Sequence, residues 1–309
     1  RDYRRVTFAP FEFAKLFNDL YRSRIVDGIF LSSGIINGGI YSQDKLIDTA
    51  EILRNKFHFP GYIHLKIMPG AEKDQIEQAM RLANRVSINL EAPNNDRLQR
   101  LTSHKTFDGE LLQPLKWIHE IRQTKPGHLA WNGHWPSSTT QFVVGAVDDT
   151  DLELLTTSQY LYQQLNLKRV YFSAFTPIID TPFENSPATS PLRERRLYEA
   201  SFLLRDYGFL VEELFYDSNA NLPLNIDPKS LWAQKYIIEP IEINRADKME
   251  LLRVPGIGIK GAAQIISTRR INPIRELSDL RSLGINPKRT APYILINGKH
   301  PIRQLAFSF

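Results

Sequence analysis

Strand-like apolar patterns alternate with helical patterns over the first 206 residues of this chain. The expected helices cover residues 11–21, 46–57, 76–83, 96–101, 152–165 and 192–206, and the expected strands cover residues 27–36, 62–68, 86–90, 140–147 and 170–174. Ser42 is the expected N-cap of the second helix. Strands that alternate with helices pair in parallel through right-handed crossovers. The pattern therefore predicts an α/β fold, either an open or closed barrel or a doubly wound sheet.

Polar residues gather where the predicted strands end. In parallel α/β folds the ligand binds at the carboxyl ends of the strands. The residues at these ends are Ser32, Ser33, Gly34, Lys66, Asn89, Glu91, Gln141 and Ser173. They contain no nucleophile beside a base, and each of them alone is typical of a loop cap. Together they predict a pocket, but they do not name its ligand.

A second pattern lies at residues 251–266, LLRVPGIGIKGAAQII, where a Pro-Gly-x-Gly turn separates two short helical patterns. Asn244 is the expected N-cap of the first helix, and Pro255 is expected to end that helix because proline has no amide to donate. The apolar residues expected to share one buried side are Met249, Leu252, Ile257, Ile265 and Ile266. This arrangement predicts a compact helical hairpin.

The turn of this hairpin is a candidate anion site. Gly256 and Gly258 are expected to allow positive φ and to leave the loop bare, so that backbone amides can approach a phosphate oxygen. Lys260 adds a positive charge at the same place. We therefore assign nucleic-acid binding to Gly256, Gly258, Lys260 and Gly261. The alternative is an ordinary helical hairpin with a glycine turn.

The three glycines of this turn also match the G-x-G-x-x-G pattern of dinucleotide-binding folds. Such a fold needs a strand before the glycines and several strand and helix units after them. The residues before Gly256 have helical spacing and end at Pro255, and fewer than fifty residues follow Gly261. A dinucleotide site is therefore disfavoured.

The positive charge of the chain resides in its C-terminal part. Residues 241–309 carry twelve Lys and Arg against five Asp and Glu, a net charge of +7, whereas residues 1–240 carry a net charge of −2. A basic segment is expected of a domain that binds a polyanion. A second, weaker hairpin is expected at residues 277–294, with Lys288 and Arg289 at the start of its second helix. It lacks the paired glycines, which favours a structural role.

These patterns divide the chain into an α/β domain at residues 1–216, a connector at 217–240 and a C-terminal domain at 241–309. Trp232 and Tyr236 in the connector are expected to pack on the α/β domain, because exposing both rings would be costly. No apolar run is long enough to span a bilayer and none resembles a signal peptide, so we expect a cytoplasmic protein.

Cysteine and metal-site motifs limit the chemistry of the chain itself. It contains no cysteine, which excludes disulfides and thiolate metal sites within it. It begins at Arg1, so we expect further residues upstream. Walker A, H-E-x-x-H and G-x-S-x-G motifs do not occur, and the loop residues His128 and His134 are weak candidates for a metal site.

Seven segments taken in order carry a resemblance to a known family. They read IFLSSGII, GYIHLKIMPGA, RVSINLEAP, TQFVVGA, RVYFSAFTP, LRERRLYEASFLLRDYGF and NRADKMELLRVPGIG. The chain resembles the radical S-adenosylmethionine proteins associated with DNA modification or repair, and its C-terminal hairpin resembles the helix-hairpin-helix family of DNA-backbone binders. The likeness covers residues 6–299.

This resemblance implies a partial (βα)6 barrel whose first strand lies upstream, followed by a small all-α helix-hairpin-helix domain. The family carries its C-x-x-x-C-x-x-C motif upstream as well. Residue by residue, Ser32, Ser33 and Gly34 match the turn that meets the methionine amino group, although they depart from the usual Gly-Gly-Glu type. Asn89 and Glu91 match positions near the ribose and carboxylate, and Gln141 matches a fifth-strand position, with Lys66 a weaker match.

The resemblance also implies two cofactors, a 4Fe-4S cluster and S-adenosylmethionine, whose 5′-deoxyadenosyl radical abstracts hydrogen from the substrate. An electron donor for the cluster and sequence-independent contact with the DNA backbone are the implied partners. None of the cluster ligands is in this sequence, so this chain alone is expected to be inactive. The alternatives are a non-catalytic DNA-binding scaffold with a degenerate barrel, and a radical enzyme acting on RNA or protein.

Overall fold

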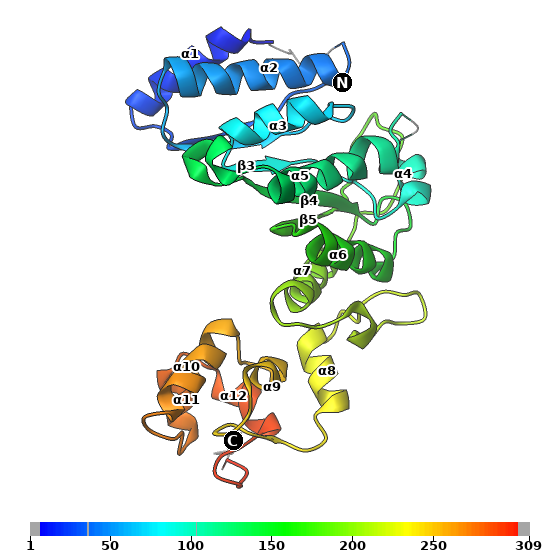
Figure 1. Ribbon diagram of the computed structural model, residues 1–309. Helices are drawn as coiled ribbons and strands as arrows, with labels where there is room; N and C mark the ends of the chain where they lie inside the picture. The colour runs from blue at the N-terminus through cyan, green and yellow to red at the C-terminus, as the bar shows by residue number, and fades with distance from the viewer. Residues whose placement is uncertain (1–6, 36, 103, 302–309) are drawn as a thin grey trace. The chain divides into compact units, whose positions relative to one another are not determined.

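A computed structural model describes residues 7–35, 37–102 and 104–301 (Figure 1). The chain forms two compact units. The first comprises Arg1–Asp149 and Thr156–Ser190, and the second comprises Thr150–Leu155 and Pro191–Phe309. The domain boundaries expected at residues 216 and 240 remain a prediction. The last residue of the first expected strand, Ile36, lies outside the described residues.

The first unit contains a parallel sheet of five strands that follow one another in chain order. They are β1 (Gly28–Leu31), β2 (Tyr62–Lys66), β3 (Arg85–Ser87), β4 (Ser137–Val144) and β5 (Arg169–Ala174). Each strand pairs with the next in parallel, for example with Phe30 opposite His64 and Val143 opposite Ser173. The α/β fold with parallel strands, predicted from the alternation of patterns, is confirmed.

Helices connect these strands, and most of them lie where helical spacing predicted. They are α1 (Pro10–Arg22), α2 (Gly39–Glu51), η1 (Ile52–Lys56), α3 (Lys73–Leu82), α4 (Asn95–Leu101), η2 (Phe107–Leu112), α5 (Gln113–Thr124), η3 (Gly127–Leu129), η4 (Trp131–Gly133) and α6 (Asp151–Leu165), the last shared between the units. The prediction that Ser42 is the N-cap of α2 was wrong. Gly38, with φ of +96°, caps α2, and Ser42 lies inside the helix with its Oγ donating to Gly38 O. The glycine lets the helix begin earlier than the serine indicated.

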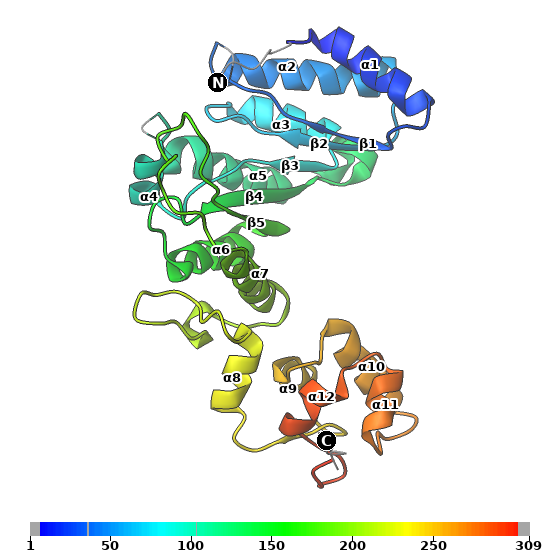
Figure 2. The same cartoon turned by 180° about the vertical axis from the view of Figure 1, so that it is seen from behind.

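The two faces of the sheet differ in chemistry. Side chains alternate between the faces along a strand. One face carries buried apolar residues such as Leu65, Val86 and Phe142, and α2, α3 and α5 lie together on one side of the sheet (Figures 1 and 2). The opposite face carries Lys66, Arg85 and other polar residues at the alternate positions. The first unit therefore has an apolar core between sheet and helices and a polar sheet face.

The second unit is mainly helical. Its elements are α7 (Pro191–Asp206), η5 (Val211–Glu213), α8 (Pro228–Tyr236), α9 (Lys248–Arg253), α10 (Ile259–Arg269), α11 (Leu277–Ser282), α12 (Pro287–Thr290) and η6 (Ala291–Tyr293), with a parallel pair β6 (Ile241–Glu242) and β7 (Ile294–Leu295). None of the helices in the described residues combines the length and the apolar character that crossing a membrane requires.

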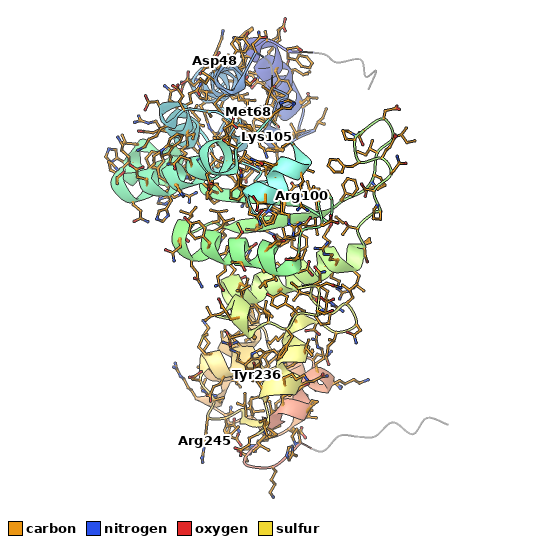
Figure 3. All side chains as sticks on the ribbon, turned by 90° about the vertical axis from the view of Figure 1, so that its right-hand side faces the viewer. Asp48, Met68, Arg100, Lys105, Tyr236 and Arg245 are labelled. Atoms are coloured by element: carbon orange, nitrogen blue, oxygen red, sulfur yellow. The ribbon has the colours of Figure 1, made fainter. Side chains whose placement is uncertain are left out.

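Helix α8 lies in the segment expected to be a connector. Asp227 caps it by accepting from the Ser230 amide, and Pro228 occupies its first position. Trp232 packs edge-on against Phe209 with ring centroids 5.4 Å apart, but Tyr236, labelled in Figure 3, is 56% exposed. The expectation that both rings are covered was wrong for Tyr236, because this short helix has no continuous apolar stripe to bury it.

A small core holds α9 to α12 together. Its fully buried members include Leu251, Leu252, Val254, Ile257, Ala262, Ile265, Leu280 and Ile285. Met249 was expected there but is 46% exposed.

Asn244 is not the N-cap of α9: Asp247 caps it in a reciprocal pair with Glu250, and the Asn244 side chain instead bonds both backbone groups of Ile274. The capping box binds two free amides of the helix, which a single asparagine further upstream cannot do.

Candidate functional site

The turn between α9 and α10 is built by two glycines with different tasks. Val254 is extended (φ −75°, ψ 125°), as expected for a residue before proline, and α9 ends at Arg253. Gly256 has φ of +88°, but Gly258 has φ of −101° and is the N-cap of α10. The expectation of positive φ is confirmed at Gly256 and was wrong at Gly258. What Gly258 provides is the absence of a side chain.

Gly256 is also held by close packing. A Cβ at this position would lie 2.6 Å from Thr290 Oγ1, 3.1 Å from Arg289 Cβ and 3.2 Å from Asn286 O. Thr290 Oγ1 meanwhile donates to Pro255 O at 3.1 Å. The turn is therefore pressed against α12, and only glycine fits both its backbone conformation and its space.

The start of α10 presents unpaired backbone amides. The first helical hydrogen bond runs from Ala262 N to Gly258 O at 2.8 Å. Within the described residues, the amides of Gly258, Ile259, Lys260 and Gly261 have no acceptor. Converging amides at a helix N-terminus attract anions, and the positive end of the helix dipole adds to this. This short segment can therefore hold a phosphate oxygen.

Lys260 and Gly261 differ in what they add to this segment. Lys260 is exposed, and no carboxylate within the described residues forms an ion pair with it. Gly261 is buried, and a Cβ there would lie 3.0 Å from Ile285 Cγ1. Gly261 therefore serves close packing between the two hairpins, in addition to its amide.

The second hairpin has a turn like that of the first, but the backbone amides at the start of its second helix are already hydrogen-bonded or absent. Gly284 has φ of +71°, matching Gly256, and Asn286 stands where the first hairpin has Gly258. The Asn286 side chain accepts from the Lys288 amide at 3.1 Å, and Pro287 has no amide. Its helix start therefore offers fewer donors to an external anion, and the structural role of the second hairpin stays a prediction.

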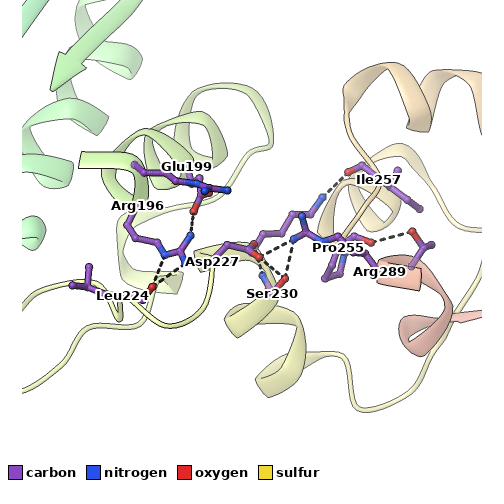
Figure 4. Close-up of polar contacts among 11 residues, drawn as sticks. Arg196, Glu199, Leu224, Asp227, Ser230, Pro255, Ile257 and Arg289 are labelled. Carbon is purple, nitrogen blue, oxygen red and sulfur yellow. Dashed lines mark hydrogen bonds and ion pairs between the residues drawn. The ribbon is translucent and has the colours of Figure 1, made fainter. Parts of the chain in front are cut away.

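The first hairpin lines a cleft of about 1230 Å³ in the second unit, with α7 and α8 on its other sides. The three arginines that line the cleft are ion-paired, two of them with one shared carboxylate. Arg195 and Arg196 pair with Glu199 at 3.0 and 2.6 Å, and Arg289 pairs with Asp227 at 2.7 Å (Figure 4). The amides of the α10 start and Lys260 therefore form the part of the cleft best suited to bind an added negative charge.

Lys229 of α8 joins this wall of the cleft. It is 9% exposed, its Nζ donates to Ile257 O at 2.6 Å, and it lies 4.8 Å from the centroid of the Tyr207 ring. Burial lowers the pKa of Lys229 to about 7, Arg289 and Arg253 lower it further, and Asp227 opposes them. The sequence patterns did not single out Lys229, because its position depends on a helix that they did not predict.

The predicted residues at the strand ends come together only in part. Lys66 Nζ donates to Asn89 Oδ1. Burial lowers the pKa of Lys66 to about 8, while Glu91 raises it and Lys105 lowers it. Glu91 has φ of +64°, and its backbone bonds β4 through Gln141 O at 3.0 Å and the Val143 amide at 2.8 Å. Four predicted residues, Lys66, Asn89, Glu91 and Gln141, therefore share one edge of the sheet.

The other four predicted residues make no side-chain hydrogen bond to this group within the described residues. Ser173 is opposite Val143 in the register, so it shares the polar face with Gln141. Ser32, Ser33 and Gly34 follow β1, and Ser33 Oγ donates to Gly34 O at 2.8 Å. Within the described residues, no hydrogen bond joins these three to the other predicted residues.

The residues present do not fit an iron–sulfur cluster. The chain contains no cysteine and so supplies no thiolate. In the described part of the chain, no three His, Cys, Asp or Glu side chains come close enough to hold a metal ion, and this includes the neighbourhood of His128 and His134.

No known protein-family model matches the chain, and a comparison with curated proteins finds no match.

Proposed function

We propose that the second unit binds the sugar-phosphate backbone of duplex DNA through the turn between α9 and α10. The observation that carries this proposal is the row of unpaired amides from Gly258 to Gly261, with Lys260 beside them. Backbone amides and a lysine recognise phosphate without reading base edges. Binding is therefore independent of sequence and sensitive to salt.

The paired hairpins support membership of this unit in the helix-hairpin-helix type. Both turns have a glycine with positive φ, and Ile257 and Ile285 are buried at equivalent positions in one core. The polar sheet face of the first unit, opposite α2, α3 and α5, supports a partial (βα)6 barrel, since a doubly wound sheet has helices on both faces.

We further propose that this chain, joined to a cluster-binding segment, acts as a radical S-adenosylmethionine enzyme that modifies or repairs DNA. Lys66, Asn89 and Glu91 offer donors and acceptors of the kinds that a ribose and an amino-acid group require. The residues of this chain do not fit a 4Fe-4S cluster, so we assign it no catalytic step. A cluster and an electron donor would have to come from outside these 309 residues.

The second candidate is a non-catalytic DNA-binding scaffold, because these residues supply the anion site of the hairpin but no ligand for a cluster. Anaerobic reconstitution with iron and sulfide of a protein that contains this chain together with a cluster-binding segment separates the two. Formation of 5′-deoxyadenosine that depends on DNA supports the enzyme, and DNA binding without it supports the scaffold. Stronger stimulation by RNA or protein than by DNA would indicate a different substrate for the same chemistry.

Removing the hairpin's anion site should weaken duplex binding uniformly across sequences. We expect the double variant Gly258→Ala, Lys260→Ala to raise the Kd for a labelled duplex by about tenfold, and the slope of log Kd against log salt to fall by about one. Fluorescence anisotropy over a salt series measures both quantities.

Lys288→Ala is the matched control, since Lys288 follows the second turn as Lys260 follows the first and is also exposed. It removes the same charge where an asparagine and a proline leave fewer amides for a phosphate. Equal losses of affinity in the two variants would show a general charge effect and contradict a phosphate site at the α10 start.

The buried lysine should make duplex binding depend on pH. In the free protein the pKa of Lys229 is about 7, and a phosphate at the turn would favour its charged form. Below pH 7 the lysine is already charged, whereas above pH 7 binding must take up a proton. The affinity should therefore fall between pH 7 and pH 9, by up to about tenfold for each unit.

Lys229→Met should flatten this pH profile at constant ionic strength. Lys235→Met, an exposed lysine on the same helix, should leave the profile unchanged. A profile that stays steep in the Lys229 variant would assign the titration to another group.

A further inference from the structure

Exposed aromatic rings stand on the polar face of the sheet. Phe30 of β1 is 56% exposed and Tyr62 of β2 is 43% exposed. The register puts Phe30 opposite His64 and Gly28 opposite Tyr62, so both rings project on the same side. Exposed rings gathered on the polar face of a sheet are a candidate surface for binding a ligand.

The aromatic surface extends across the sheet. The Phe30 and His64 rings have centroids 4.4 Å apart, and His64 bonds Ser87 Oγ at 2.8 Å. Tyr171 of β5 lies on the same face, with the Arg169 guanidinium 4.9 Å from its ring centroid. Burial raises the pKa of Tyr62, with Tyr171 raising it further and Arg85 opposing them, so the three groups lie within electrostatic reach.

The charge of this face is positive. Its strand positions carry Lys66, Arg85 and Arg169, and none of these positions, all within the described residues, is Asp or Glu. Arg85 Nε bonds Ser137 Oγ at 3.1 Å, which holds the guanidinium over the face. The carboxylates Asp27 and Glu91 lie outside these strand positions, Asp27 before β1 and Glu91 beyond the end of β3. The face therefore suits a ligand that is both aromatic and anionic.

We infer that this sheet face binds unpaired nucleotides of single-stranded DNA, with bases stacked on Phe30 and Tyr62 and phosphates held by Arg85 and Arg169. Flat rings interleaved with arginines are the means by which proteins hold single strands without reading their sequence. An acidic peptide would pair with the positively charged side chains but would leave the exposed aromatic rings without a stacking partner. The inference goes beyond duplex binding by the hairpin and stands without it.

The test separates stacking from charge attraction. Labelled twelve-nucleotide oligothymidine and an abasic oligomer of the same length are titrated with the whole chain in the Gly258→Ala, Lys260→Ala background, which removes the hairpin contribution. We expect oligothymidine to bind at least tenfold more tightly than the abasic oligomer. Phe30→Ala with Tyr62→Ala should reduce oligothymidine affinity by tenfold or more and leave the abasic oligomer unchanged.

Two further variants complete the design. Arg85→Gln should weaken the binding of both oligomers. Tyr160→Ala removes a 39% exposed ring on α6, away from the sheet positions, and should change neither. Thermal melting checks that each variant is folded.

Equal binding of the two oligomers, or full oligothymidine affinity in the double aromatic variant, would overturn the inference. Tighter binding of oligouridine than of oligothymidine would overturn the choice of DNA. The duplex titration of the hairpin variants is a separate readout, so failure of one proposal does not imply failure of the other.

Discussion

Replacing Gly256 with alanine should lower the free energy of unfolding of the second unit by about 3 kcal/mol. Alanine at φ of +88° carries backbone strain of about 1–2 kcal/mol. Its Cβ would also lie 2.6 Å from Thr290 Oγ1 and 3.2 Å from Asn286 O, which forces α12 away and adds about 1–3 kcal/mol. Urea denaturation followed by circular dichroism measures the change.

Two other glycines separate the causes of this loss. Gly284→Ala has strain but no clash, because φ is +71° and no heavy atom lies within 4 Å of a Cβ there. Gly258→Ala has neither, since φ is −101° and its Cβ would lie 3.4 Å from the Tyr207 hydroxyl oxygen. The expected order of destabilisation is Gly256, then Gly284, then Gly258. A Gly256 variant no less stable than the Gly284 variant would contradict the packing of the turn on α12.

This order also separates structure from binding in the hairpin. Gly258→Ala is expected to leave the unit folded while its added methyl group crowds the amides at the start of α10. Gly256→Ala is expected to disturb the fold first. Loss of duplex binding in a fully folded Gly258 variant is therefore evidence about the anion site itself.

Replacing Arg54 with methionine should cost the first unit about 4 kcal/mol. Arg54 is 3% exposed and donates from its guanidinium to the carbonyls of Phe59, Gly61 and Leu82 and to Asn84 Oδ1, at 2.6 to 3.0 Å. Methionine fills a similar volume but leaves these buried acceptors unpaired. Each unpaired acceptor destabilises the fold by about 1–3 kcal/mol before the surrounding structure relaxes. The stacked Trp131 ring, 3.9 Å from Arg54 Cζ, also loses its cation.

The charge state of Arg54 supports this expectation. Burial lowers its pKa to about 10, so it remains charged at neutral pH and its hydrogen bonds are charge-assisted. Arg54→Lys should recover less than half of the lost stability. The four acceptors are arranged around the plane of the guanidinium group, and a single ammonium group cannot reach all of them.

Lys56→Met is the matched control for Arg54. Lys56 lies on the same short helix, is exposed, and contacts only the Phe11 ring at 4.3 Å among the interactions of the described residues. Its loss should change the unfolding free energy by less than about 1 kcal/mol. Similar effects at residues 54 and 56 would show that Arg54 does not organise the ends of β2 and the neighbouring helices.

The caps and the connector show where local patterns fail. Ser42 and Asn244 are good capping residues, yet Gly38 and Asp247 cap the helices. A serine or asparagine side chain can cap a helix or stabilise a turn equally well. Which of the two it does depends on the residues that surround it in the folded structure. Helix α8 escaped prediction because its nine residues have no apolar stripe, so its own sequence does not favour burial of one face.

The sequence by itself determined the five parallel strands and the glycine turn with Lys260, and of the eight residues predicted at the strand ends the structure joins Lys66 to Asn89 and Glu91 to Gln141 by hydrogen bonds. Periodic burial and strand direction are local properties, and parallel strands bring their ends to one edge. Only the tertiary structure decided that Lys229 is buried against Ile257, and that Gly258 leaves amides open where Asn286 closes them. Those outcomes depend on packing between segments that are distant in the chain. This packing sets how far Lys229 is desolvated and which hydrogen bonds form, and it produces no periodic pattern in the sequence.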